Sequence, residues 1–196
     1  GGGLVAAPAD QAYTDWGCPG EPITGADGIL IGTGMQNTID IEAGCTTIGT
    51  AADVCANLSL GGYSDWFLPS KDELNEMYIN IFSGTGNFGF SVGQYYVSST
   101  EYNNSRVWCQ LFAPISNPSA GQQFTEPKDN APMKVRAIRA FTSNSNYYTY
   151  NWSPGGETTS SITVQPNETT TYTVDVTSGT TTCQSDVTIS VNQRDL

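Results

Sequence analysis

Apolar residues recur at helical spacing between residues 70 and 81 and predict a helix with one apolar face. They are Leu74, Met77, Tyr78 and Ile81. Ser70 is a favourable N-cap, and Glu73 three residues later completes a capping box in which each side chain accepts a hydrogen bond from a backbone amide. A short aromatic strand with Trp66 precedes this helix, and Pro69 keeps the residue before it extended. We expect this corner, including Trp66, Ser70 and Glu73, to be structural.

The region before this corner is rich in loops and predicts three short elements. Residues 4–8 should form a strand that ends at a proline, and residues 37–42 one or two helical turns. Thr50 should cap a short helix over residues 50–58. The apolar residues of this helix, which we expect to face inward, are Val54, Cys55 and Leu58.

After the helix predicted over residues 70–81, period-two alternation predicts a β-hairpin. Its antiparallel strands are residues 95–101 and 106–112, and its tight turn is 102–105. Residues 113–133 contain four prolines and no clear period, which is typical of a long exposed loop. A final strand is expected over residues 134–141.

Arg136 and Arg139 lie three residues apart in that final strand, so their side chains should point to opposite faces of a sheet. We expect one of them to be drawn inward to a carboxylate such as Glu101 or Asp65, because an unpaired buried charge is very costly.

Composition changes sharply at Thr142. Residues 142–146 read as a polar linker between a domain at 1–141 and a Thr- and Ser-rich module at 147–196. The strands predicted in the module from period-two alternation are 148–152, 161–164, 171–177 and 186–191. An immunoglobulin-like sandwich needs about seven strands. The module must therefore lean on the first domain or be completed by something outside this chain.

Composition and charge narrow the function classes. The chain has 196 residues and a net charge of −12, from 7 Lys and Arg against 19 Asp and Glu. This acidity opposes binding to nucleic acid and to anionic membrane surfaces. There is no apolar run long enough to insert into a membrane, and no His to serve as a general base or a metal ligand. The chain begins with Gly rather than Met, and we expect it to be processed, trimmed or excised.

The cysteines suit a secreted or surface protein, and their odd number, five, leaves at least one thiol free or paired between chains. Cys18, Cys45 and Cys55 cluster early, and a Cys45–Cys55 disulfide would close a short loop. No Cys-x-x-Cys pair suggests zinc. Cys109 and Cys183 are the expected unpaired cysteines, with Cys109 buried and inert.

The segment Gly-Tyr-Ser-Asp-Trp-Phe-Leu-Pro-Ser-Lys-Asp-Glu-Leu at 62–74 resembles the Lcl C-terminal-domain family, the globular heads of collagen-like bacterial adhesins. Further matches lie at 3–8, at 97–101 followed by Trp108, and at 135–141. The resemblance implies an α+β, C-type-lectin-like domain with short helices and a small antiparallel sheet, related to formylglycine-generating enzymes. It also implies adhesion and glycan binding.

The segment Tyr-Asn-Trp-Ser-Pro-Gly-Gly-Glu-Thr-Thr at 150–159 is similar to Ig-like or PKD-like modules of surface proteins from Bacteroidetes-type bacteria. This similarity implies a small all-β Ig-like sandwich. By comparison with these families, we expect the opening strand of Lcl-type heads and the first strands of the Ig-like module to be missing. An open sheet edge would invite strand addition from a neighbour.

A sugar-binding site needs flat apolar faces together with amides or carboxylates for the hydroxyl groups. The hairpin supplies this mixture, and the residues proposed to bind a ligand are Glu101, Tyr102, Asn103, Asn104 and Tyr96. Trp108 is assigned to the core. Calcium could be held by loop acids, but no EF-hand spacing is present, and solvated surface acids are the favoured interpretation. These acids are Asp10, Asp15, Asp27, Asp40 and Glu42.

The leading hypothesis is an extracellular or cell-surface bacterial adhesion module without enzymatic activity or cofactor, which recognises a glycan or a surface polymer. The alternative is a structural subunit of an extracellular filament, in which copies of the chain join by strand donation at open sheet edges. An enzyme of the formylglycine-generating type is disfavoured, because no Cys is convincingly placed for that chemistry.

Overall fold

The computed structural model describes residues 2–129, 131–142 and 148–192. The fold is α+β, with short helices and mostly antiparallel strands. It divides into two compact units, Gly2–Thr142 and a second one that begins at Ser143. Thr142, which we expected in the linker, is the last residue of a strand, and the rest of the predicted linker lies outside the described residues.

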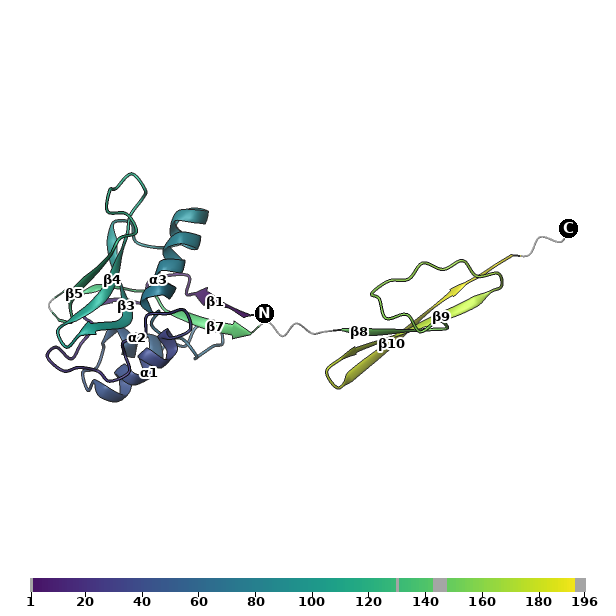
Figure 1. The fold of residues 1–196 in the computed structure, drawn as a ribbon, viewed down its shortest axis with the longest axis horizontal. Helices are drawn as coiled ribbons and strands as arrows, with labels where there is room; N and C mark the ends of the chain where they lie inside the picture. Colours follow the sequence, from purple (N-terminus) through teal and green to yellow (C-terminus); the bar gives the residue numbers. More distant parts are fainter. Residues whose placement is uncertain (1, 130, 143–147, 193–196) are drawn as a thin grey trace. The chain divides into compact units, whose positions relative to one another are not determined.

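The first unit is built on a five-stranded sheet with the order β2-β6-β3-β4-β5, of which Figure 1 labels β3, β4 and β5. Its β3 and β6 are parallel, and its other neighbouring strands are antiparallel. A separate antiparallel pair joins β1 to β7. The bounds of these strands are β1 Gly2–Ala6, β2 Ala12–Thr14, β3 Gln94–Asn103, β4 Arg106–Phe112, β5 Gln123–Pro127, β6 Met133–Val135 and β7 Ile138–Thr142.

Two helices begin where their capping residues predict, whereas the helix predicted over residues 37–42 begins earlier, at Gly34, and its N-cap residue Thr33 makes no side-chain cap bond. Helix α3 covers Lys71–Met77 and continues as a π-helix, η1, over Tyr78–Gly86. The capping box is confirmed, because the Glu73 amide donates to Ser70 Oγ at 3.3 Å and the Ser70 amide donates to Glu73 Oε2 at 2.8 Å. Thr50 likewise caps the preceding helix, α2 (Ala51–Ala56), since the Asp53 amide donates to the Thr50 hydroxyl oxygen. Helix α1 covers Gly34–Gly44.

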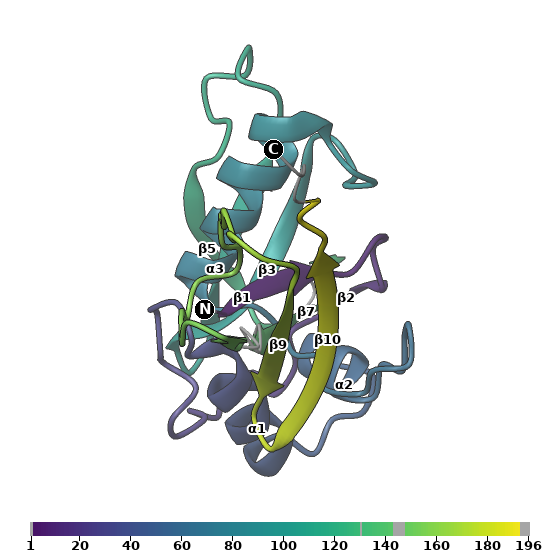
Figure 2. The same cartoon turned by 90° about the vertical axis from the view of Figure 1, so that its right-hand side faces the viewer.

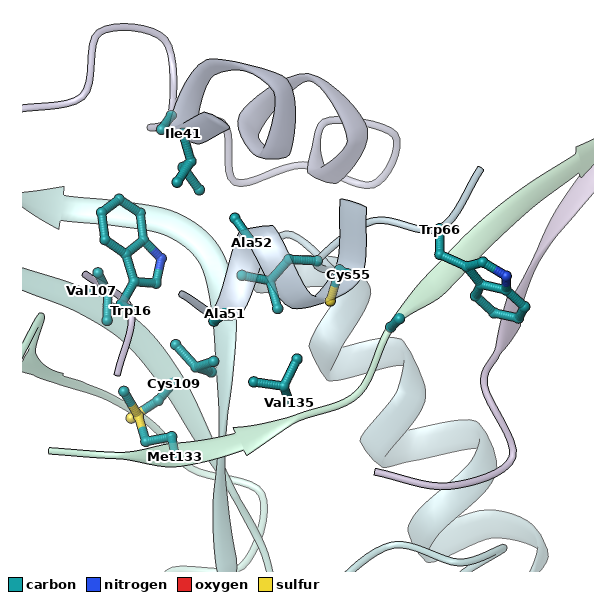
Figure 3. Packing of buried hydrophobic residues seen from close by; sticks show 14 of the residues in the cluster. Trp16, Ile41, Ala51, Ala52, Cys55, Trp66, Val107, Cys109, Met133 and Val135 are labelled. Carbon is teal, nitrogen blue, oxygen red and sulfur yellow. The ribbon is translucent and has the colours of Figure 1, made fainter. Parts of the chain in front are cut away.

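Two buried clusters hold the first unit together. One lies between α1, α2 and the sheet and includes Trp16, Ile41, Cys55 and Val135 (Figure 3). The other is aromatic and packs η1 against β3 and β4. Its rings are Phe67, Tyr78, Phe82, Phe90, Tyr96 and Phe112. Burial of these large apolar side chains is the main force that stabilises the unit.

Three predicted elements differ from the structure. The loop at 113–133 contains β5, which is ordered because it pairs with β4 along its whole length. The final strand at 134–141 is two strands in different sheets, since the chain turns at Arg136 and Ala137. The aromatic strand before α3 is reduced to a single bridge between Phe67 and Ile138.

The second unit contains one described sheet with the order β10-β9-β8, and Figure 2 shows β9 and β10 side by side. Its strands are β8 Thr149–Ser153, β9 Thr170–Ser178 and β10 Thr181–Ile189. The predicted strand at 161–164 has no strand partner. None of the described residues of this unit is buried, and they form no second layer. A sandwich is therefore not present in the described part of the unit.

Candidate functional site

A loop at residues 20–26 is fastened to the end of the β3–β4 hairpin. The Gly20 amide donates to the Asn104 carbonyl at 2.8 Å, and the Glu101 amide donates to the Ala26 carbonyl at 2.7 Å. Between these two points, the Ile23 amide donates to Glu101 Oε2 at 2.8 Å. The loop is thus held at both ends and in the middle, which gives the surface between loop and hairpin a defined shape.

A buried ion pair lies directly under this loop. Lys128 Nζ is 2.7 Å from Glu101 Oε1, and the side chains are 0% and 7% exposed. The same ammonium donates to the Glu21 carbonyl at 2.7 Å and lies 4.6 Å from the centre of the Trp16 ring. Both charges are therefore paired and hydrogen-bonded, which is the condition under which buried charges are tolerated.

The loop and the hairpin enclose a groove of about 330 Å³, near the lower end of the roughly 300–1,000 Å³ typical of small-ligand sites. Its wall combines an exposed aromatic ring, amides, a hydroxyl and a carboxylate. The lining residues are Pro22, Ile23, Thr24, Gly25, Asp27, Glu101, Tyr102, Asn103 and Asn104. The groove therefore brings four of the five sequence-selected ligand residues to one place.

Tyr102 is the exposed aromatic of this groove, with 55% of its surface accessible. Its ring meets Trp108 edge to face, with 5.4 Å between the ring centres. Lys71 Nζ lies over the Trp108 ring, 4.7 Å from its centre. The prediction of Trp108 as a core residue is wrong, because the side chain is only partly buried and instead supports Tyr102.

The two asparagines are partly engaged in the turn. Asn103 Oδ1 accepts from the amides of Ser105 and Arg106, each at 2.9 Å. Its amide nitrogen takes no part in these bonds and is the group that could donate to a ligand. Asn104 Oδ1 accepts from the Ser105 hydroxyl, and its nitrogen makes a long 3.5 Å contact with the Gly20 carbonyl. Asn104 can exchange that weak contact for one to a ligand.

Two of the proposed ligand residues need correction. Glu101 lines the groove but is 8% exposed and is engaged by Lys128 and the Ile23 amide, so it holds the loop. Tyr96 is fully buried, and its hydroxyl donates to Asp10 at 2.8 Å. Burial raises the pKa of Tyr96 to about 12. Tyr96 is a core residue, since its neighbour Tyr95 occupies the outward position on the strand.

The predicted partners of the arginines are corrected in part. Arg136 is the inward one, 1% exposed, but it pairs with Asp10 at 2.8 Å rather than with Glu101. Arg139 pairs with Asp65 at 2.7 Å at the surface. The hydrogen bond from Arg139 is the main reason that the pKa of Asp65 lies below its usual value.

The predicted disulfide is wrong. Cys45 bonds to Cys18, which closes a loop over 27 positions that contains the groove-lining segment and α1. Cys55 instead lies fully buried in the core, where desolvation raises its pKa (Figure 3). Cys109 is also a buried free thiol with a pKa raised to about 12, chiefly by burial, as its predicted inertness requires. The third free thiol, Cys183, is exposed.

Sequence reasoning missed the contributions of Thr24 and Lys128 and considered Asp27 only as a calcium ligand. No local signal could have joined the loop to the hairpin, because they lie more than 70 positions apart.

A second, more apolar pocket of about 340 Å³ lies beside Trp66 and α1 and contains none of the selected ligand residues. Trp66 is buried there, as its structural assignment requires.

No group of three or more acidic, His or Cys side chains that could hold a metal occurs among the described residues. Within the same ranges, each helix is too short or too polar to cross a membrane. Comparison of the chain with protein-family models, with curated proteins and with solved structures gave no match.

Proposed function

We propose that the first unit is the binding module of an extracellular or cell-surface bacterial adhesin and that it holds a saccharide in the groove between residues 22–27 and 101–104. The observation that carries this proposal is the exposed ring of Tyr102, braced by Trp108, in a groove that also presents amide and carboxylate groups. An aromatic face can pack on the C–H side of a sugar ring, while Asn103, Asn104 and Asp27 can bind its hydroxyl groups.

Charge favours a neutral saccharide. The chain carries a net charge of −12, and Asp27 adds an exposed carboxylate to the groove wall. A sulfated or uronic acid polymer would therefore be repelled at the site itself, as well as by the overall field. The Cys18–Cys45 disulfide is in keeping with an oxidising compartment such as the cell exterior.

Binding without catalysis is part of the proposal. Glycoside hydrolysis needs two carboxyl groups that flank the scissile bond. Of the two carboxylates at this groove, Glu101 is held by Lys128 and by the Ile23 amide, which leaves Asp27 without a second carboxylate free to act with it. The groove suits recognition of a ligand better than its cleavage.

The test is binding of the full chain to an array of neutral and acidic glycans, followed by titration of the best ligand. Tyr102→Ala should weaken binding at least about tenfold, which corresponds to the roughly 1.4 kcal/mol expected for one aromatic contact. Asn104→Ala should weaken it less. Tyr13→Ala is the matched control, because Tyr13 has a similar exposure of 59% on a different strand. Unchanged affinity in both groove variants, or binding to acidic glycans alone, would contradict the proposal.

A further inference from the structure

The strand β1 has an open edge. It pairs with β7, and just beyond the two strands the Ala7 amide donates to the Ala137 carbonyl at 2.9 Å. In antiparallel pairing, alternate residues bond to the partner, so Leu4 and Ala6 direct their backbone N–H and C=O groups away from β7. No strand pairs with that edge in the described ranges.

This edge lacks the usual protection against pairing. Natural edge strands carry charges, prolines or bulges that block addition of another strand. The sequence of β1 is Gly-Gly-Leu-Val-Ala, which is uncharged, and its pairing with β7 runs without a bulge. Leu4 and Val5 are 37% and 41% exposed. The edge is therefore a favourable template for an incoming strand.

A groove lies beside the open edge. It measures about 350 Å³ and is lined by residues of β1, α3 and the start of η1. Figures 1 and 2 both show α3 next to β1. Ile31, which is 58% exposed, also lines it. An extended segment paired with β1 would direct alternate side chains into this groove, the arrangement of peptide recognition by strand addition. The lining is mainly apolar, and the helices add three polar residues to it. The apolar residues are Leu4, Ala6, Met77, Ile81 and Ile138, and the polar ones are Glu73, Glu76 and Asn80.

The second unit contains a segment with the matching properties. Residues 161–164, Ser-Ile-Thr-Val, have the alternation of a strand, yet they have no strand partner in the structure. Ile162 and Val164 fall on one side of such a strand and are only half-buried. Residues 158–167 carry no charge, so they can approach an acidic molecule without added repulsion. Pro166 lacks an amide proton and would end the pairing.

We propose that residues 160–165 of one copy of this chain add as a strand to the open edge of β1 in a second copy. Ile162 and Val164 then fill the groove beside α3. The contacts given up are a bond from the Thr159 hydroxyl to the Ser161 carbonyl and the partial burial of Ile162 and Val164 in their own unit. Donor and acceptor are different surfaces, so every copy offers one of each and the association continues into an open chain or a closed ring.

A complementation experiment tests this inference, with the full chain carrying Cys183→Ser to prevent disulfide links between copies. Leu4→Pro removes an amide that faces the open edge and leaves the bonds to β7 in place. Ile162→Asp with Val164→Asp blocks the donor. By size-exclusion chromatography with light scattering, the parent should form oligomers that grow with concentration, and each blocked variant should be monomeric. An equimolar mixture of the two should form a species of two chains and nothing larger.

Three results would overturn the inference. They are a parent chain that stays monomeric at every concentration, a donor-blocked variant that still oligomerises, and a mixture that forms no dimer. Ile115→Asp is the control for loss of an exposed apolar residue elsewhere, at 87% exposure, and should oligomerise like the parent. If Leu4→Pro does not fold, Ile31→Lys blocks the groove without changing β1. Tyr102→Ala should not alter assembly, so the glycan proposal and this one fail separately.

Discussion

Removing Lys128 tests whether the buried ion pair positions the groove. Lys128→Met keeps an unbranched apolar chain one atom shorter than lysine but leaves Glu101, 7% exposed in its side chain, without its counter-charge. It also removes the bond to the Glu21 carbonyl and the contact with Trp16. Removing one partner of a buried ion pair lowers the free energy of unfolding by about 3–5 kcal/mol, because the other charge stays buried without its counter-charge. For a unit of this size, that corresponds to a fall in melting temperature of about 10–15 °C.

The assay is urea unfolding followed by tryptophan fluorescence, since Trp16 lies against the ammonium. Glu101→Gln keeps an acceptor for the Ile23 amide and removes the charge. The double variant should therefore lose much less stability than the sum of the two single variants, with a coupling free energy of about 2 kcal/mol or more. Glycan affinity should fall in Lys128→Met and recover in part in the double variant.

Lys71→Met is the matched control, because Lys71 also lies over a tryptophan ring but has no buried carboxylate partner in the described structure. It should cost at most about 1 kcal/mol, the value of a cation–π contact at an exposed site. The reasoning is refuted if Lys128→Met lowers the free energy of unfolding no more than Lys71→Met does. It is also refuted if the stability losses of the Lys128 and Glu101 substitutions simply add in the double variant.

The remaining predictions concern the cysteines and the central helix. At pH 8 a thiol reagent should label Cys183 alone in the native chain and three thiols after unfolding. Labelling of a second thiol in the native chain would contradict the burial of Cys55 and Cys109. Peptide mapping should recover the Cys18–Cys45 link. Burial raises the pKa of the Cys109 thiol from 9.0 to about 12, so the folded state keeps the thiol proton at a pH where the unfolded state loses it. The contribution of Cys109 to stability is therefore full below about pH 9 and is lost as the pH rises to about 12. Cys109→Ala should reduce that alkaline loss in a series of urea titrations. Ser70→Ala should lower the free energy of unfolding by about 1 kcal/mol through loss of the cap, and an unchanged value would show that the capping box does not stabilise α3.

The sequence by itself determined the local elements of this protein. Ser70 and Glu73 predict the start of α3, since a capping box involves groups only three residues apart. The start and end of β4 at Arg106 and Phe112 were also predicted, because strand alternation and turn chemistry are read from neighbouring residues. These signals do not depend on the rest of the chain.

Only the tertiary structure decided which face of a strand lies inside and which distant groups meet. Alternation places Tyr95 and Tyr96 on opposite faces, but the packing of the aromatic cluster put Tyr96 inside. The partner of Glu101 lies 27 positions away, and Arg136 reaches Asp10 across 126 positions. Such pairs are selected by how the elements pack, because a charge or a thiol carries no information in sequence about which of several possible partners the fold will bring to it.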